Sequence, residues 1–247
     1  MTTTDANHAR VSAAQLRVMP LHAITEVYGE PGLRRRLTLE LERLPDPHRR
    51  VIDDAAGWAT DLHAGQRRTR EPYVNHPLRV TLRMLCHYRV TDADVLAAGL
   101  LHDVVEDQPW AVTGITRHGP PPTAQALTAI AERYNPRVAR LVAALTTPPR
   151  PDSVDRIRHY TDHLAAALDA QPWARVIKLS DFTDNGAGII HAIGPKLARS
   201  AHKYDTAVPV LRELLDRPDT PLSEDVKDHI HRQLNLARQR FAAILAA

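Results

Sequence analysis

The feature that most constrains the fold of this chain is an apolar run that ends in a cluster of ionisable side chains. The segment Ala97–Leu101 contains only small and apolar residues, so a helix through it should be buried. An imidazole and three carboxylates follow within six residues: His102, Asp103, Glu106 and Asp107. Charged groups are rarely buried unless they are paired or bound to a metal ion. The sequence therefore predicts a functional site in the core, although a helix-end ion cluster would account for these residues taken alone.

The spacing of these residues would bring their side chains together on one helix. Side chains three or four positions apart share a helical face, which pairs Glu106 with both His102 and Asp103. Successive residues of a helix point about 100° apart, so His102 and Asp103 could grip one ion between them. Imidazole and carboxylate donors suit Mn, Fe, Zn or Mg in different combinations. The pattern is thus compatible with a divalent metal site.

Two further segments contain residues that suit phosphate and metal chemistry. Residues 62–77 include H-A-G-Q-R-R followed by E-P-Y-V-N-H-P. Residues 175–185 read R-V-I-K-L-S-D-F-T-D-N, which places an aspartate and an asparagine four positions apart on one helical face. Arginine binds phosphate oxygens in a bidentate manner, so Arg67 and Arg68 are candidate phosphate ligands.

Together, the motifs H-x-G-Q-x-R, E-P-Y-x-x-H-P, L-L-H-D-x-V-E-D and K-L-x-D-x-x-x-N resemble the hydrolase domain of the RelA/SpoT family, within the HD superfamily of metal-dependent phosphohydrolases. The resemblance runs from about residue 51 to residue 185. It implies an all-α fold, a single HD-domain helical bundle with one divalent metal ion in its core, and Mn²⁺ is the expected ion. The metal ligands that it implies are His63, His102, Asp103 and Asp181.

The same resemblance implies roles for the residues around the metal. Glu106 and Asp107 would be the catalytic pair that orients or deprotonates the attacking water, and either one could be the acid. The residues expected to bind the nucleotide are Arg68, Tyr73, Asn185 and Arg67. His76 is expected to be a structural neighbour of the site, and Asp184, which no motif supports, is expected to face solvent. The implied reaction removes the 3′-diphosphate of (p)ppGpp-like alarmones and releases pyrophosphate.

Departures from the family pattern leave two other functions open. Gly186-Ala187-Gly188 stands where the family continues with an apolar residue and an arginine. Because this segment borders the expected nucleotide pocket, the chain could instead be an HD phosphohydrolase of another nucleotide or phosphoester. The third alternative is a protein that binds a nucleotide or a partner and uses its metal only structurally. The pair Glu106 and Asp107 argues against this alternative, because a site without catalysis has no chemical need for it.

Composition restricts the class of protein further. The chain has 247 residues, of which 43% are hydrophobic and 25% are charged, as in an ordinary globular protein. A net charge of +3 and an aromatic content of 4% do not favour nucleic-acid binding. No apolar run approaches the roughly 20 residues of a membrane span, and the N-terminus lacks a signal-peptide core. Composition thus agrees with a cytoplasmic enzyme, and the resemblance implies that its substrate is a small nucleotide; a homo-oligomer is compatible with this size.

Helical periodicity extends over nearly the whole chain, and strand-like alternation is essentially absent. Residues 1–32 are predicted to be a weakly structured N-terminal extension and residues 33–247 an HD-type domain, with C-terminal helices at 195–247. The expected helices cover 33–44, 53–63, 77–87, 92–107 with Thr91 as N-cap, 123–134, 136–145, 153–168, 172–185, 195–215 and 223–245. Segments 108–122 and 146–152 are predicted loops, and the first would be either a lid or a surface insertion.

Overall fold

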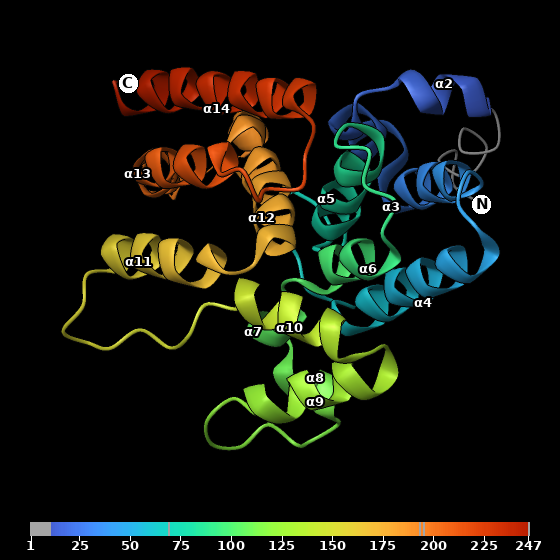
Figure 1. Ribbon diagram of the computed structural model, residues 1–247, viewed down its shortest axis with the longest axis horizontal. Helices are drawn as coiled ribbons and strands as arrows, with labels where there is room; N and C mark the ends of the chain where they lie inside the picture. The colour runs from blue at the N-terminus through green and yellow to red at the C-terminus, as the bar shows by residue number, and fades with distance from the viewer. Residues whose placement is uncertain (1–10, 69, 193, 195, 247) are drawn as a thin grey trace.

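The structure, a computed structural model, describes residues 11–68, 70–192, 194 and 196–246 and is helical over most of them (Figure 1). Within these ranges the only extended pairing is an isolated bridge between Arg67 and Pro72. The all-α prediction is therefore confirmed. No helix of the described chain is long and apolar enough to cross a membrane. The elements are α2 (Ala13–Val18), α3 (Leu21–Leu41), α4 (Asp46–Leu62), α5 (Asn75–Cys86), α6 (Ala93–Leu101), α7 (Val104–Asp107), α8 (Pro109–Thr113), α9 (Thr123–Arg133), α10 (Pro136–Leu145), α11 (Arg156–Asp169), α12 (Pro172–Asn185), the 3₁₀ helix η1 (Ala187–His191), α13 (Leu197–Asp216) and α14 (Glu224–Leu245).

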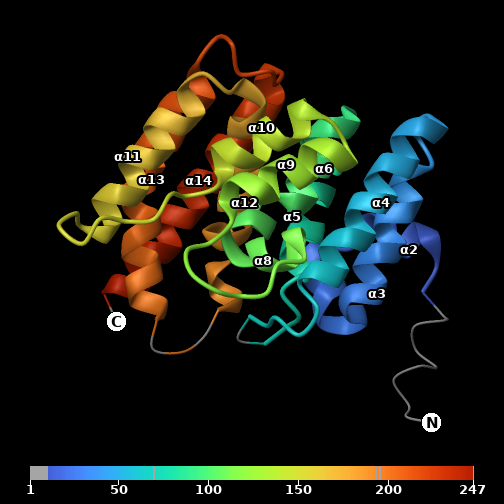
Figure 2. The same cartoon turned by 90° about the horizontal axis from the view of Figure 1, so that it is seen from below.

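Helix α12 forms the central column of the molecule (Figure 1). Helices α11, α13 and α14 pack on one side of it, and α5 and α6 pack on the other side, where α3 and α4 cover them. Figure 2 shows the same division from below, with α11 and α13 side by side at one end and α2, α3 and α4 at the other. Side chains on α12 can therefore contact both halves of the molecule.

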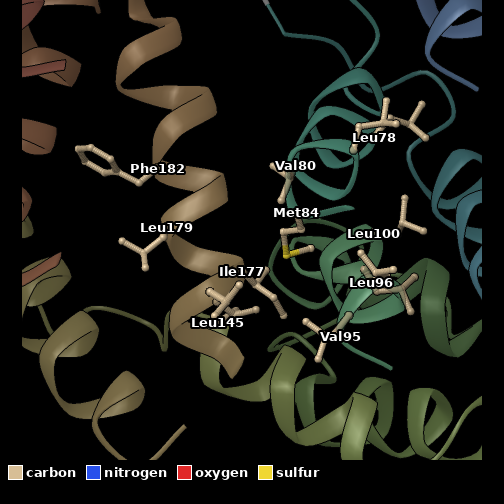
Figure 3. Close-up of a cluster of buried hydrophobic side chains, with 14 of the residues drawn as sticks. Leu78, Val80, Met84, Val95, Leu96, Leu100, Leu145, Ile177, Leu179 and Phe182 are labelled. Carbon is tan, nitrogen blue, oxygen red and sulfur yellow. The ribbon is translucent and has the colours of Figure 1, made fainter. Parts of the chain in front are cut away.

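Buried apolar side chains fill the space between α12 and the two helices that face it (Figure 3). Val80 and Met84 of α5 and Ile177 of α12 have no exposed surface. Burial of one such side chain stabilises the fold by about 1.5–3 kcal/mol. Helix α6 approaches α5 closely at Gly99, where an added Cβ would lie 2.3 Å from the Met84 Cε and 3.1 Å from the Thr81 Oγ1. The small residues of the α6 run thus have a packing function.

Helix boundaries agree best with the sequence where a proline or a capping residue marks them. Helices α10 and α12 begin at Pro136 and Pro172, as predicted, because the first helical position needs no N–H donor. The predicted helix at 92–107 differs in two respects. Its N-cap is Asp92, whose carboxylate accepts bonds from two backbone N–H groups, and not Thr91. In addition, α6 ends at Leu101 and the chain turns before the short α7 begins, so the continuous helix is wrong.

The segment before Leu33 was expected to be weakly structured, and for its described part this is wrong. Ser12 caps α2 in a reciprocal pair of hydrogen bonds with Gln15. Leu16 of α2 and Ile24 of α3 are fully buried in the core. Residues 1–10 lie outside the described residues, as does position 195, where a helix was expected to begin. The division of the chain at residue 32 into an extension and a domain stays a prediction.

Of the two predicted loops, residues 146–152 are a loop in the structure, whereas residues 108–122 contain a short helix. Residues 108–122 include the short helix α8, so this segment is only partly a loop. The part that follows is exposed, and Arg117 lies over the Trp110 ring with its Cζ 4.8 Å from the ring centroid. This exposure favours the interpretation of a surface insertion. Residues 146–152 have no helix, as predicted, and the next helix starts at Arg156 with Asp155 as its cap.

Candidate metal centre

Three buried side chains from three different parts of the chain converge between α5, α6 and α12. His76 lies in the first turn of α5, His102 follows the end of α6, and Asp181 lies in α12. Each offers one ligand atom, and these atoms all lie within 4.8 Å of one another. His76 has no exposed surface, and 2% of His102 and 4% of Asp181 are exposed. The packing of α5 and α6 against α12 therefore creates a compact donor group.

Hydrogen bonds fix the tautomer of both histidines. The Nδ1 of His76 lies 2.9 Å from a carboxylate oxygen of Asp184, and the Nδ1 of His102 lies 2.8 Å from the carbonyl oxygen of Gly99. Because these oxygens only accept, each Nδ1 carries a proton, and in the neutral form of each ring the Nε2 presents a lone pair. Metal-binding histidines are commonly oriented in this way by an acceptor on the far ring nitrogen.

The two Nε2 atoms point at carboxylate oxygens and not at donors. His76 Nε2 lies 3.1 Å from Asp181 Oδ1, and His102 Nε2 lies 3.2 Å from Asp103 Oδ2. Neither Nε2 has a hydrogen-bond partner, although both are buried. Lone pairs and carboxylates at these distances repel one another unless a positive charge lies between them. The residues present therefore fit a bound divalent cation.

The pKa shifts within the group also indicate that it favours a positive charge at its centre. Burial disfavours the imidazolium form, but the carboxylates of Asp103 and Asp181 raise the pKa of His102 to about 9 when no metal is bound. Burial alone would raise the pKa of Asp181, but Lys178, whose Nζ lies 2.7 Å from Asp181 Oδ2, and the facing histidines hold it well below its ordinary value. A proton on His102 thus substitutes for the cation that this donor set favours.

Asp184 was expected to face solvent, and this is wrong. Its carboxylate has no exposed surface and accepts hydrogen bonds from His76, Arg79 and Arg83 at 2.9 to 3.2 Å. Burial alone would raise the pKa of Asp184, but Arg79 and the other two donors hold it well below its usual range. Glu71 forms a second, bidentate pair with Arg79 at 2.7 and 2.8 Å. Asp184 therefore holds the His76 ring in place from within a buried ion network.

His63, the ligand expected first in the chain, lies outside the converging group. It follows the last residue of α4, its ring stacks on Tyr73 at a centroid distance of 4.7 Å, and its Nδ1 bonds Gln66 Oε1 at 2.7 Å. Among the described residues, the group of three within 4.8 Å contains His76 and not His63. His63 Nε2 is nevertheless also buried without a hydrogen-bond partner, so His63 stays a predicted ligand.

Asp103 borders the group. Its Oδ2 lies 3.6 Å from His76 Nε2 and accepts a 2.7 Å hydrogen bond from the Tyr73 hydroxyl. Burial alone would raise the pKa of Asp103, but the adjacent His102 and then His76 hold it well below its ordinary value. An ionised carboxylate at this position completes a set of two imidazoles and two carboxylates.

Residues predicted to bind the nucleotide lie next to this set. Arg68 donates to Asn185 Oδ1 at 2.8 Å, and Asn185 in turn donates to Asp181 Oδ1 at 2.6 Å. The Arg68 guanidinium also lies over the Tyr73 ring, with Cζ 5.0 Å from the centroid. The structure therefore brings Arg68, Tyr73 and Asn185 together. Arg67 is exposed, and within the described chain its guanidinium is not seen to contact the others.

Glu106 and Asp107 are exposed at the edge of the centre. Glu106 accepts a hydrogen bond from the backbone N–H of Thr147 at 2.9 Å, and Asp107 accepts one from the Gln66 amide at 2.9 Å. Partial desolvation raises the pKa of Glu106, and Asp103 and Asp107 add to this effect. Gln66 therefore connects Asp107 to His63, which gives His63 a role in the hydrogen-bond network around the acids.

Sequence reasoning placed His76 beside the site and Asp184 in solvent but did not predict that the two pair in the core, although a signal was present. His76, Arg79 and Arg83 are spaced three and four residues apart, so they share one face of an otherwise apolar helix. Asp181 and Asp184 are three residues apart on α12, which is also buried. A basic face and an acidic face on two buried helices predict that the helices pair through these residues.

The chain is similar in sequence and in fold to known proteins. Residues 55–171 match the family model described as the HD domain. The chain is 30% identical over 164 residues to the guanosine-3′,5′-bis(diphosphate) 3′-pyrophosphohydrolase of Aquifex aeolicus (strain VF5), covering 64% of this chain and 20% of that protein. It is 33% identical over 132 residues to the guanosine-3′,5′-bis(diphosphate) 3′-pyrophosphohydrolase MESH1 of Mus musculus, covering 52% of this chain and 63% of that protein. The chain thus spans less than two thirds of either relative.

A solved structure described as a metazoan ortholog of SpoT that hydrolyzes ppGpp superposes on this fold with a TM-score of 0.54. The two chains are 25% identical, and the match covers 75% of this chain and 96% of the other. Residues 55–171 of this chain thus resemble the HD domain, and the chain is similar in sequence and fold to proteins named as ppGpp 3′-pyrophosphohydrolases.

Proposed function

We propose that this chain is a Mn²⁺-dependent phosphohydrolase that removes the 3′-diphosphate from ppGpp-like nucleotides and releases pyrophosphate. The observation that supports it best is the buried group of His76, His102 and Asp181 beside an exposed pair of carboxylates. The names of the related proteins supply the substrate class. A protein that only binds a nucleotide would not need Glu106 and Asp107 at the edge of this group.

The metal would be held by the two Nε2 atoms of His76 and His102 and by the carboxylates of Asp103 and Asp181. A divalent cation at this position supplies positive charge that polarises a phosphoryl group and makes a nearby water a stronger acid. Mn²⁺ suits a donor set that mixes imidazole with carboxylate. His63 remains a predicted ligand without support from the grouping of donor atoms.

We assign the two acids separate proton transfers. Glu106 takes a proton from the attacking water, whose oxygen forms a bond to the phosphorus next to the ribose. The bond from that phosphorus to O3′ then breaks, and pyrophosphate leaves. The protonated carboxyl group of Asp107 donates a proton to O3′. The raised pKa of Glu106 supports its role as the base, because a carboxylate base is most effective when its pKa approaches the working pH.

The nucleotide would lie against Arg68, Tyr73 and Asn185. Arg68 is held in place by its bond to Asn185, so its planar guanidinium can stack on a base or bind phosphate oxygens without further ordering. The bond from Asn185 to Asp181 couples this nucleotide side of the site to the metal ligands.

The test is to incubate the protein with Mn²⁺ and ppGpp, pppGpp, ppApp or ordinary nucleotides and to measure pyrophosphate and phosphate. Pyrophosphate from a 3′-diphosphate is expected. Phosphate from another nucleotide and none from these substrates would instead identify an HD phosphohydrolase of different specificity. In the variant Glu106→Gln we expect about 10²- to 10⁴-fold slower hydrolysis with the metal content unchanged. Glu132→Gln, at an exposed position on α9, is the matched control. Full activity of the Glu106 variant would contradict its role as the base.

A further inference from the structure

A lysine on α13 lies close to the metal centre without a carboxylate partner. Lys203 is half-buried, and its Nζ lies over two aromatic rings, 4.0 Å from the centroid of Tyr160 and 5.5 Å from that of Tyr204. No ion pair joins Lys203 to any acid of the described chain. Lysine is rarely buried without a counter-charge, and aromatic faces replace only part of its hydration. An ammonium group in this setting is therefore suited to binding an anion.

A second ammonium group shares the same ring and connects Lys203 to the metal ligands. Lys178 of α12 has its Nζ 5.7 Å from the Tyr160 centroid and 2.7 Å from Asp181 Oδ2. Burial and then the like charge of Lys178 lower the pKa of Lys203. Two ammonium groups on one ring repel each other, and an anion placed against both would relieve that repulsion. Helices α11 and α13, which supply Tyr160 and Lys203, pack side by side (Figure 2).

Asp181 lies between two positively charged groups, Arg68 on one side and Lys178 on the other, and each of its two oxygens faces one side. Its Oδ1 accepts from Asn185, which holds Arg68, and its Oδ2 accepts from Lys178. The Arg68 guanidinium is already bonded to Asn185 and stacked on an aromatic ring, so its remaining planar face suits a planar group. The Lys203 ammonium has no such bond, and it suits a tetrahedral phosphate as a compact point charge.

We infer that Lys203, supported by Lys178 and Tyr160, forms a second anion subsite beside the metal centre, and that it binds the 5′-diphosphate of the nucleotide. The inference rests on the proposed function, in which the 3′-diphosphate lies at the metal. A second diphosphate is stabilised by nearby positive charge. Arg68 and Lys203 both lie near the centre without an ion pair in the described chain, but Arg68 is already bonded to Asn185, whereas the Lys203 ammonium contacts only aromatic rings. Lys203 is thus a specificity residue that selects nucleotides with a 5′-diphosphate.

The experiment compares Lys203→Met with the wild type, using Lys203→Arg as the conservative variant and Lys196→Met as a control at an exposed lysine. GDP, which has only the 5′-diphosphate, is the binding probe for the Mn²⁺-loaded protein. We expect its dissociation constant to rise about 10- to 100-fold in Lys203→Met, the range of a lost hydrogen bond to a charged group. Lys203→Arg and Lys196→Met should both stay within about threefold of the wild type.

Turnover supplies a second measurement that a purely structural role would not reproduce. For ppGpp, Lys203→Met should raise KM by a similar factor and leave kcat within about threefold of the wild type. For guanosine 3′-diphosphate, which has no 5′-phosphate, both constants should be unchanged. GDP binding equal to that of the wild type, or an equal loss for both substrates, would overturn the inference. If the wild type hydrolyses neither nucleotide, the proposed function fails, and GDP binding still decides whether the subsite exists.

Discussion

Replacing Asp184 by asparagine is expected to lower both the free energy of unfolding and the affinity for the metal ion. The Asp184 carboxylate is fully buried and accepts bonds from His76, Arg79 and Arg83. Removing one partner of a buried ion pair costs about 3–5 kcal/mol. We expect the lower end, about 3 kcal/mol, because Arg79 keeps its bidentate pair with Glu71. The asparagine amide would also point an N–H group at one of the three donors. Either the His76 ring or one of the two arginines would therefore lose its hydrogen-bond acceptor.

Metal affinity should fall about 10- to 100-fold in this variant, the usual effect of removing a group that orients a ligand histidine. Urea unfolding in EDTA measures the stability, and Mn²⁺ titration of the folded protein measures the affinity. Arg83→Met is the matched control, since it loses a bond to Asp184 and one to the Ser180 carbonyl but does not contact His76. It should lose stability and keep the metal. Unchanged metal affinity in Asp184→Asn would refute the orienting role of Asp184.

Two further predictions concern the core and proton release. Phe182→Ala should lose about 3–5 kcal/mol in urea unfolding, because the ring packs edge-on against Tyr204 and Phe241 at centroid distances of 5.8 and 6.3 Å; a loss below about 1 kcal/mol would contradict this packing. Near neutral pH, Mn²⁺ binding should release about one proton, because the carboxylates around His102 outweigh its burial and raise its pKa to about 9 in the metal-free protein. Calorimetry in buffers of different ionisation enthalpy measures this release, and a buffer-independent heat would contradict it. Because the folded-state pKa of His102 lies above its ordinary value of 6.5, the stability that it contributes in EDTA should fall as pH rises from about 6.5 through about 9.

Features set by local sequence were predictable. Helix α12 begins at Pro172 and α10 at Pro136, because proline is compatible with the first turn and unfavourable further along a helix. The buried run at 97–101 lies in α6 as expected, with every residue in contact with the core. Local rules failed where tertiary packing decides. The turn after Leu101 interrupts a sequence that has helical periodicity, and α2 is ordered by burial of Leu16 against its neighbours.

In the candidate metal centre, too, some features follow from local sequence and others from tertiary packing. His102 and Asp181 were predicted as metal ligands because each ends or follows an apolar run within a distinctive motif, and the structure brings their donor atoms together. The approach of His76 to Asp181 could not be predicted locally, because His63 and His76 are both near one end of a helix in neighbouring motifs. It depends on how α5 packs against α12, which brings the Nε2 of His76 to 3.1 Å from Asp181 while His63 stacks on Tyr73. The acid that orients His76 lies 108 residues away in sequence.

Helices α5 and α12 contribute both to the apolar core and to the candidate metal centre, so an ion bound there would affect the stability of the fold. Along α5 and α12, Val80, Met84 and Ile177 exclude water from the interface, while His76 and Asp181 place charge and lone pairs within it (Figure 3). Apolar burial favours the pairing of these helices, but desolvation of the polar groups opposes it. A divalent ion would remove that opposition, because it would satisfy donors from α5, α12 and the end of α6 at once. Since these donors come together only in the folded chain, the free energy of metal binding would also stabilise the fold, and the ion would join α5 and α6 to α12.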